Sequence, residues 1–393
     1  MPASICSRRF LIPLMLLPGL LLACGVFSSL SPQVSEPTPE MTPLSTQTPL
    51  DSFSLPAPLY YLHEGQIWRL SADTSSQQQI TQEDAPIDAF DLSPVDGSLV
   101  FVSNNSLILT DPDGSNRKVM HQGPALADEP DDVARLNDID QITSAIRTPH
   151  WSPDGKQIVF IENGLQLIEL DTNQVEHLWR QSIESSEPYV FENVLSWSPD
   201  GKYLLVSQYE YPIEHTGNRW LSLLELGEML YLQIANPNQE SFAWSPDSSQ
   251  LYLANAGFGW DDSLMRCEME DQGCTLIAEF VPARSYYFYA HPYVIDEDEL
   301  MVFSGGSNDP DEQPAEFILY KLTSQGYGYH KVRGDGFLPQ EGLWSTNGDG
   351  VVITLAREAE TYPAGSTLWL STSDVPAIPL PIMDVSNLRW GQP

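Results

Sequence analysis

Three segments of this 393-residue chain share one short pattern, and it constrains the fold more than any other feature. Each segment starts with tryptophan, continues Ser-Pro-Asp, and is followed within a few residues by an apolar run. The tryptophans are Trp151, Trp197 and Trp244, which are 46 and 47 residues apart. A nearly constant period of this length indicates one supersecondary unit that is stacked several times.

The residues of the pattern indicate a strand, a tight turn and a second strand. Proline presets φ near about −65° at the second turn position, aspartate accepts hydrogen bonds from the backbone that follows it, and glycine tolerates positive φ. The first two copies end Asp154-Gly155 and Asp200-Gly201, and the third keeps the aspartate as Asp247. The following runs are rich in Ile, Val, Leu, Phe and Tyr, which suits strands buried on both faces.

Weaker copies extend the series over the rest of the chain. We call the residue that ends the strand before each turn its anchor. Leu92 precedes Ser-Pro-Val-Asp-Gly, and Trp344 and Trp390 are 46 residues apart. The 100 residues between Trp244 and Trp344 leave room for a degenerate copy around Ala290-His291-Pro292. The predicted anchors are therefore Leu92, Trp151, Trp197, Trp244, His291, Trp344 and Trp390.

The two ends of the series complement each other. The first apolar strand, residues 59–62, has no turn before it, and the last anchor, Trp390, has no strand after it. The C-terminal segment can therefore complete the sheet that the N-terminal segment begins. A period of about 40–50 residues with four strands per unit is typical of β-propellers. We predict an all-β fold, a closed propeller of seven four-stranded blades over residues 59–393, with six or eight blades as alternatives.

The Trp-Ser-Pro-Asp-Gly repeat resembles the WD-like propeller repeat of the TolB C-terminal domain. It is also similar to the N-terminal propellers of prolyl-oligopeptidase-type peptidases. Leu107–Asn116 and Gln66–Leu70 match the strand-turn element of the family. The resemblance covers residues 59–393 and implies a propeller, of six blades in TolB against seven anchors here. It implies no peptidase activity, since no peptidase domain follows, and not TolB's own partners, since TolB's N-terminal α/β domain is missing.

Residues 1–23 have the composition of an export signal, with Arg8 and Arg9 before an apolar run that is too short to span a bilayer comfortably. The run ends Leu-Leu-Ala-Cys, which resembles a bacterial lipoprotein box. We expect cleavage before Cys24 and attachment of lipid to its sulfur; an ordinary secretory signal is the alternative. Residues 24–58 add a linker rich in Pro, Ser and Thr, which cannot form a core. Together they predict an extracytoplasmic protein anchored by lipid to the cell membrane, or to the outer membrane if the organism has one.

The net charge is −36, although charged residues make up only 18% of the chain. The imbalance reflects few Lys and Arg more than an excess of acids. It argues against nucleic acid and against docking on anionic lipid, and it leaves cations or basic proteins as partners. A surface that is merely soluble is the alternative explanation.

Two cysteines remain after the expected cleavage, Cys267 and Cys274, seven residues apart. In an oxidising compartment we expect a disulfide between them that clamps a hairpin of the fifth unit. A metal site is the alternative, but neither a further Cys nor clustered His supports one. We expect no metal and no cofactor.

The sequence holds no nucleophile elbow, phosphate loop or dinucleotide fingerprint. Asp111–Asn116 and Asn308–Glu312 offer oxygens of the kind that calcium binds, but Asp-Pro-Asp-Gly is first of all a turn. The acidic insert, residues 128–140, indicates a solvated loop. His150 and His291 lie beside predicted turns, where packing or capping is the expected role.

Aromatic residues gather in the fifth unit and at its exit. If several face the channel or one rim they can bind a glycan or a peptide, and packing between blades is the alternative. The candidate binding residues are Phe258, Trp260, Tyr286, Tyr287 and Tyr289. We expect a monomeric, non-catalytic binding module for a protein or cell-wall partner. A hydrolase or lyase acting on glycans or peptides, or a small-ligand sensor, is the alternative.

Overall fold

The computed structural model divides the chain into two units, Met1–Asp51 and Ser52–Pro393. The expected signal, Cys24 and most of the linker lie outside the residues it describes, and so do Phe258 and Trp260. Everything below concerns the second unit. The described residues are 53–126, 139–180, 189–210, 219–226, 230–235, 241–254, 264–270, 273–276, 286–296, 299–308, 314–323, 328–359 and 362–393.

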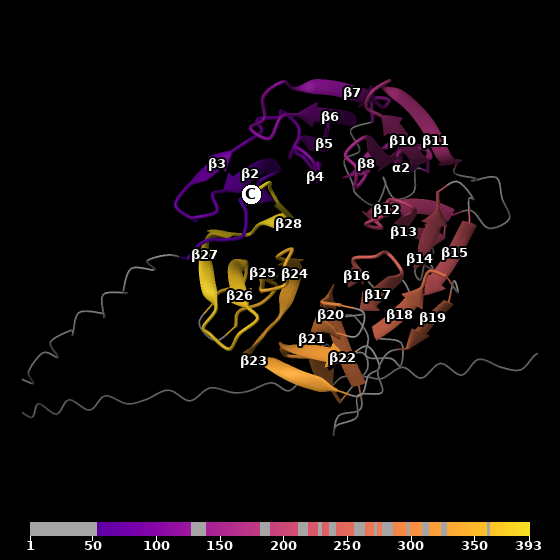
Figure 1. The fold of residues 1–393 in the computed structure, drawn as a ribbon. Helices are drawn as coiled ribbons and strands as arrows, with labels where there is room; N and C mark the ends of the chain where they lie inside the picture. The colour runs from indigo at the N-terminus through magenta and orange to yellow at the C-terminus, as the bar shows by residue number, and fades with distance from the viewer. Residues whose placement is uncertain are drawn as a thin grey trace, which may run out of the picture. The chain divides into compact units, whose positions relative to one another are not determined.

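Seven four-stranded antiparallel sheets form a ring, which confirms the predicted seven-bladed β-propeller (Figure 1). We number the blades in chain order and give their strands from the innermost outward. Blade 1 contains β28 (Ser386–Trp390), β1 (Leu59–His63), β2 (Gln66–Leu70) and β3 (Gln77–Gln79). Blade 2 contains β4 (Phe90–Leu92), β5 (Leu99–Ser103), β6 (Ser106–Thr110) and β7 (Lys118–Gln122). Blade 3 contains β8 (Arg147–Trp151), β9 (Gln157–Ile161), β10 (Gly164–Glu169) and β11 (Gln174–Arg180).

The remaining four blades repeat this order. Blade 4 contains β12 (Tyr189–Trp197), β13 (Tyr203–Glu210), β14 (Arg219–Glu225) and β15 (Leu230–Ala235). Blade 5 contains β16 (Ser241–Trp244), β17 (Gln250–Ala254), β18 (Leu264–Glu268) and β19 (Gly273–Leu276). Blade 6 contains β20 (Tyr286–Val294), β21 (Glu299–Ser307), β22 (Phe317–Thr323) and β23 (Tyr329–Phe337). Blade 7 contains β24 (Pro339–Trp344), β25 (Gly350–Leu355), β26 (Ser366–Ser371) and β27 (Ile378–Met383).

The ring closes within blade 1, as the unmatched ends of the repeat predict. The C-terminal strand β28 pairs antiparallel with β1, with Leu59 opposite Trp390 and Tyr60 opposite Arg389. The N-terminal segment therefore supplies three strands of this sheet and the C-terminal segment supplies the innermost one. This pairing covers the edge of β1 that would otherwise be open for pairing with another chain.

Each Ser-Pro-Asp turn is held by its own side chains. In blade 3, Ser152 donates through Oγ to Asp154 Oδ1 at 2.7 Å, and the N–H of Lys156 donates to the same oxygen at 3.1 Å. Gly155 has φ +68°, which is the conformation its position requires. The same serine–aspartate bond forms between Ser198 and Asp200 at 2.6 Å and between Ser245 and Asp247 at 2.7 Å. The repeat is therefore a self-contained turn that starts the second strand of blades 3, 4 and 5.

The anchor of blade 6 differs from the prediction. Val294 pairs with Leu300, and the N–H of Ile295 donates to Glu299 O across the turn. This is the position that Trp244 holds in blade 5, so Val294 is the anchor and His291 lies three residues before it. The prediction was wrong because a shorter turn replaces Ser-Pro-Asp-Gly in this blade, and the spacing alone could not place it.

The core lies between neighbouring blades. Most of the second strands are largely buried; in β25, for example, every residue from Gly350 to Leu355 is buried. Three of the anchor tryptophans join adjacent blades through their indole N–H groups. Trp244 donates to Ser196 Oγ at 2.9 Å, Trp344 to His291 O at 3.0 Å, and Trp390 to Trp344 O at 2.7 Å. Each blade is thus fixed to its neighbour by apolar packing and by an indole hydrogen bond at these three joints.

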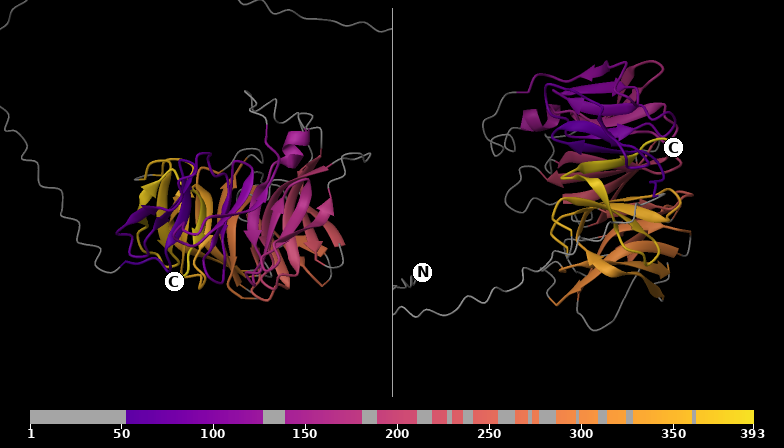
Figure 2. Two further views of the ribbon diagram at one scale, coloured as in Figure 1. Left: turned by 90° about the horizontal axis from the view of Figure 1, so that it is seen from above. Right: turned by 90° about the vertical axis from the view of Figure 1, so that its left-hand side faces the viewer.

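The ring has two unlike faces. All innermost strands run in the same direction and end at the anchors, so the Ser-Pro-Asp turns lie on one face, which we call the turn face. Helix α2 (Ile139–Ser144) projects from the opposite face, the helix face (Figure 2). The chain reaches blade 1 at the turn face, where the N–H of Leu55 donates to Ala72 O at 2.8 Å. In the described part of the chain, no helix has the length and apolarity needed to cross a membrane.

Candidate functional site: the central channel

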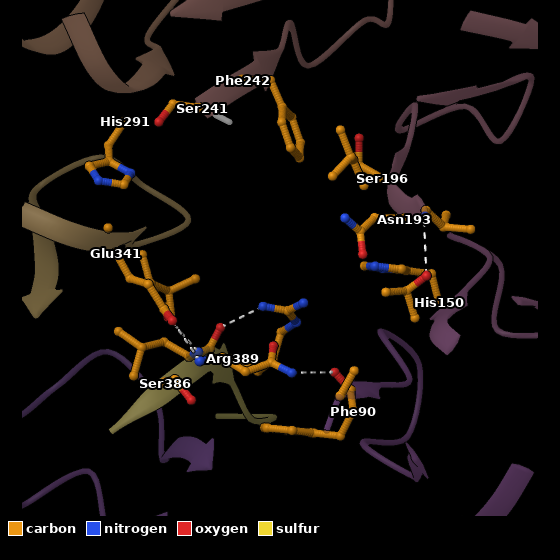
Figure 3. Close-up of a pocket in the computed structure, with 18 of the residues that line it drawn as sticks. Phe90, His150, Asn193, Ser196, Ser241, Phe242, His291, Glu341, Ser386 and Arg389 are labelled. Carbon is orange, nitrogen blue, oxygen red and sulfur yellow. Dashed lines mark hydrogen bonds between the residues drawn. The ribbon is translucent and has the colours of Figure 1, made fainter. Parts of the chain in front are cut away.

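A channel of about 1000 Å³ runs through the middle of the ring, and all seven blades contribute to its wall (Figure 3). The innermost strand of each blade, or the residues just before it, supply this lining. Concave sites of this size commonly hold ligands. It is therefore the first place to look for function.

Three charged or titratable side chains from consecutive blades meet beside the channel: His150 and Arg389 line it, and Asp91 contacts both. Asp91, His150 and Arg389 each lie one position before the anchor of blades 2, 3 and 1. Asp91 Oδ1 accepts from Arg389 Nε at 3.1 Å, and its Oδ2 lies 3.5 Å from His150 Nδ1. Asp91 Oδ2 also accepts from the backbone N–H of Trp151 at 2.9 Å. This carboxylate therefore links three blades at the point where the ring closes.

The pKa of Asp91 follows from these contacts. Burial raises the pKa, but the hydrogen bond from His150, the charges of His150 and Arg389, and the N–H of Trp151 outweigh burial and hold it below its ordinary value. Asp91 is therefore ionised at neutral pH. Its contacts with Arg389, His150 and the backbone of Trp151 hold the three blades together.

A second set of joints lies three positions before the anchors. Glu341 accepts from the backbone N–H of Asn387 at 2.9 Å and of Leu388 at 3.2 Å. On the opposite side, Thr148 Oγ1 accepts from the N–H of Val194 at 3.0 Å. These contacts between equivalent positions satisfy backbone groups that pairing within a blade leaves free.

Strained backbone marks the same level of the channel. Thr148, His291 and Asn387 have φ of +40°, +48° and +54°, and each lies three positions before an anchor. Residues other than glycine rarely adopt such angles, least of all a β-branched threonine. A register shift accompanies each of them, between Arg147 and His150 in β8, for example. The bulges change the direction of these residues relative to the channel.

His291 occupies the channel wall because of a glycine in the next blade. A Cβ on Gly342 would lie 2.7 Å from His291 Cγ, so only glycine leaves room for the ring. Burial lowers the pKa of His291 to about 4, against a partial rise from a hydrogen bond with the backbone of Pro339. The imidazole is therefore uncharged at neutral pH.

The rest of the labelled wall is polar and uncharged, apart from two aromatic residues, Phe90, which is buried, and Phe242. Asn193, Ser196, Ser241 and Ser386 come from three different blades, and Phe242 extends from blade 5 into the channel (Figure 3). Arg389 directs its guanidinium into the same space, where Nη1 donates to Leu388 O at 2.9 Å. The channel thus combines hydrogen-bond donors, acceptors and one partly exposed ring.

Two of the aromatic residues singled out from the sequence, Tyr287 and Tyr289, lie outside the channel. Tyr289 is buried between blades 5 and 6, in the cluster that includes Tyr252 and Leu300, and Tyr287 packs against that cluster. Burial raises the pKa of Tyr289, as expected for a packed phenol. The side chain of Tyr286, like Phe258 and Trp260, lies outside the described residues. For Tyr289 the position is that of packing between blades, the alternative considered for the whole group.

The predicted disulfide is present, joining Cys267 of β18 to Cys274 of β19, which face each other across the hairpin of blade 5. Asp111 and Asp113 serve their own turn: Asp111 accepts from Asn116 Nδ2 at 2.6 Å, and Asp113 from the N–H of Ser115 at 2.9 Å. Among the described residues, no three His, Cys, Asp or Glu side chains are placed to bind one metal ion. Of the acidic insert, 139–140 begin helix α2 and are not loop; 128–138 lie outside the described residues.

The channel residues Asp91, Arg389, Glu341 and Phe242 were not found by sequence reasoning. Their signal was available in principle, because each lies one to three positions before an anchor in a strand that must face the ring's centre. No motif distinguishes them, however, because they meet only through ring closure.

Fold and channel together define a seven-bladed β-propeller with a central channel lined by both polar and apolar residues. The sequence matches no protein-family model and no curated protein. Two similar solved structures reach a TM-score of 0.52. One, an oligogalacturonate lyase in complex with manganese, is 11% identical, with 80% of this chain and 82% of that chain covered. The other, a functionally unknown protein from Desulfotomaculum acetoxidans DSM 771, is 13% identical, with 86% and 99% covered.

TolB from Acinetobacter baumannii is also matched, at 14% identity and a TM-score of 0.41, with 83% of this chain and 78% of that chain covered. At such identities, similarity to solved structures establishes the propeller fold alone. What the protein binds must be argued from its own residues.

Proposed function

We propose that this chain is a lipid-anchored, extracytoplasmic binding module that holds a protein or a component of the cell envelope and catalyses no reaction. The proposal rests on the carboxylates at the channel, which are already engaged in hydrogen bonds between blades. Asp91 and Glu341 each accept backbone N–H groups from the neighbouring blade. A carboxylate that already accepts hydrogen bonds from the backbone is poorly suited to exchange protons with a substrate.

The two faces support a binding role and suggest its direction. Short turns close the turn face, and the chain reaches the ring on that face. The connections of the helix face include the insert between β7 and β8. Asn105, in the turn between β5 and β6, contacts both ends of this insert: its Nδ2 donates to Pro124 O at 2.8 Å and to Ser144 O at 3.1 Å. The helix face lies opposite the point where the chain enters the ring, and it is the face that we propose for binding. Binding residues are commonly found on such loops.

Crosslinking in the native cell envelope tests the proposal. A photoreactive amino acid is placed in the full-length protein at Glu64 or Asn163, exposed on the helix face, and in parallel at Val95 or Lys156 on the turn face. We expect one reproducible partner, protein or glycan, from the helix-face positions and none from the turn-face positions. A Cys24→Ala variant, which removes the expected lipid anchor, controls for contacts made only after loss of membrane attachment. Equal capture from both faces would contradict a directed binding module.

Catalysis is the competing function, since one structural neighbour is a lyase. A hydrolase or lyase of this kind generally needs an acid and a base that act on the substrate. Incubating the full-length protein with cell-wall and polysaccharide substrates separates the two. Turnover that is lost in a Glu341→Gln variant would overturn the non-catalytic proposal.

A further inference from the structure

We propose that the central channel binds an uncharged, polyhydroxylated ligand, such as the end of a neutral glycan. This rests on the proposed function, since it names the ligand class of a binding module. The wall brings together side chains that bind hydroxyl groups: Asn193 and the serines donate and accept, and Arg389 donates. A ligand rich in hydroxyls can use both kinds of partner.

The charges of the channel disfavour an anionic ligand. Asp88 and Glu341 line the channel and Asp91 contacts the lining residue Arg389, so three carboxylates outnumber the one guanidinium of Arg389. Burial holds His291 neutral at physiological pH, so it adds no positive charge. The chain as a whole carries a net charge of −36, which repels anions before they arrive.

The same carboxylates disfavour a cationic ligand. Glu341 is engaged by the N–H groups of Asn387 and Leu388, and Asp91 by Trp151 and Arg389. A cation would have to compete with these contacts, which hold neighbouring blades together. The cost of breaking them opposes cation binding.

Phe242 supplies the remaining element of the site. Its side chain is partly exposed and extends into the channel from blade 5, opposite the wall formed by Arg389 and Ser386 (Figure 3). A flat aromatic ring offers an apolar face to the C–H side of a sugar ring, while the polar wall takes the hydroxyls. With about 1000 Å³, the channel lies at the upper end of the usual range of small-ligand sites and has room for several sugar rings.

Isothermal titration calorimetry on the full-length protein in detergent tests the proposal. The probes are neutral tetrasaccharides (of N-acetylglucosamine, glucose in β-1,4 linkage, and glucose in α-1,4 linkage), tetragalacturonate as the acidic counterpart, and a tetralysine peptide as the basic one. We expect at least one neutral tetrasaccharide to bind with a Kd of about 1 mM or lower. We expect no measurable binding of the acidic or the basic probe.

Variants assign the binding to the channel. Asn193→Ala and Phe242→Ala each weaken it about tenfold or more, and Ser386→Trp blocks it by filling space without removing a contact. Asn173→Ala is the matched control, because Asn173 is exposed in a turn far along blade 3. Circular dichroism verifies folding of each variant, and Ser386→Trp keeps the test valid if an alanine variant does not fold.

Three results would overturn the proposal: binding of tetragalacturonate or tetralysine in preference to every neutral probe, neutral binding that the channel variants leave unchanged, or no binding of any probe. The proposed function fails differently. If the envelope partner is still captured by the Phe242→Ala and Ser386→Trp variants, the binding module stands and only the ligand class of the channel falls.

Discussion

Asp91 shows how much of the ring depends on single residues. Its carboxylate contacts Arg389 from the C-terminal strand, the backbone of Trp151 from blade 3, and His150 beside it. Glu341 makes the corresponding joint between blades 7 and 1. Neither residue is recognisable from the sequence, because its partners lie tens to hundreds of positions away. The Ser-Pro-Asp turns, by contrast, are local and could be predicted residue by residue.

Replacing Asp91 with asparagine is expected to destabilise the fold by about 2–3 kcal/mol, because it leaves a partly buried guanidinium without its counter-ion. Urea unfolding followed by tryptophan fluorescence measures the change. Asp84→Asn, at an exposed position, is the matched control and should cost less than about 0.5 kcal/mol. Equal stability of the two variants would show that Asp91 does not join the blades.

His291 should make stability depend on pH between about 4 and 6.5. Burial lowers its pKa to about 4 in the folded state, whereas the unfolded chain takes up the proton near 6.5. Between these values the unfolded state binds more protons, so stability is complete above 6.5 and falls as the pH drops toward 4. Melting temperatures from pH 7.5 to 4 test this. His291→Gln should flatten the slope in that window; an unchanged slope would assign it to other groups.

At the scale of elements, the repeat predicts most strands but not every boundary. Anchors at Leu92, Trp151, Trp197, Trp244, Trp344 and Trp390 end their strands as expected. The repeat does not predict the anchor of blade 6, because Val294 replaces tryptophan and the turn lacks Ser-Pro-Asp. Only the pairing of Val294 with Leu300 defines the register of this blade. The repeat does not predict helix α2 either, because this helix is a six-residue insertion outside the repeat.

The disulfide is expected to stabilise the hairpin of blade 5. Closing the short loop between Cys267 and Cys274 restricts the unfolded chain, and loop entropy gives about 2–3 kcal/mol. The Cys267→Ser/Cys274→Ser double variant should therefore melt at a lower temperature than the oxidised protein. Reducing agent should lower the melting temperature of the parent protein alone. Two titratable thiols in the unreduced parent protein would contradict the bond.

At the scale of the whole molecule, ring closure places function-bearing residues together. The seven-fold repeat predicts that a central channel exists, because innermost strands must face a common axis. It does not predict what lines it, since Arg389, Asn193 and Phe242 belong to different blades and follow no repeat. The fold was therefore accessible from sequence, and the character of the channel required the three-dimensional arrangement.

Deleting residues 386–393 removes β28, the innermost strand of blade 1, and should abolish cooperative unfolding, because blade 1 loses its inner strand and its contacts with Glu341 and Asp91. Deleting only residues 392–393 is the control and should retain a single transition. Differential scanning calorimetry distinguishes the two. A synthetic peptide of residues 386–393 should restore the transition to the longer deletion; a cooperative transition without it would show that closure is dispensable.

The position of β1 has a mechanical consequence. The chain enters the ring at the turn face, and β1 runs from that face into the middle of a sheet, between β28 and β2. A pull on the chain ahead of β1 therefore acts along the strand, and the hydrogen bonds on both of its sides share the load at once instead of opening one after another. Such shear loading resists force far better than unzipping does. A propeller anchored as proposed can therefore hold a bound partner under tension without its first blade unravelling.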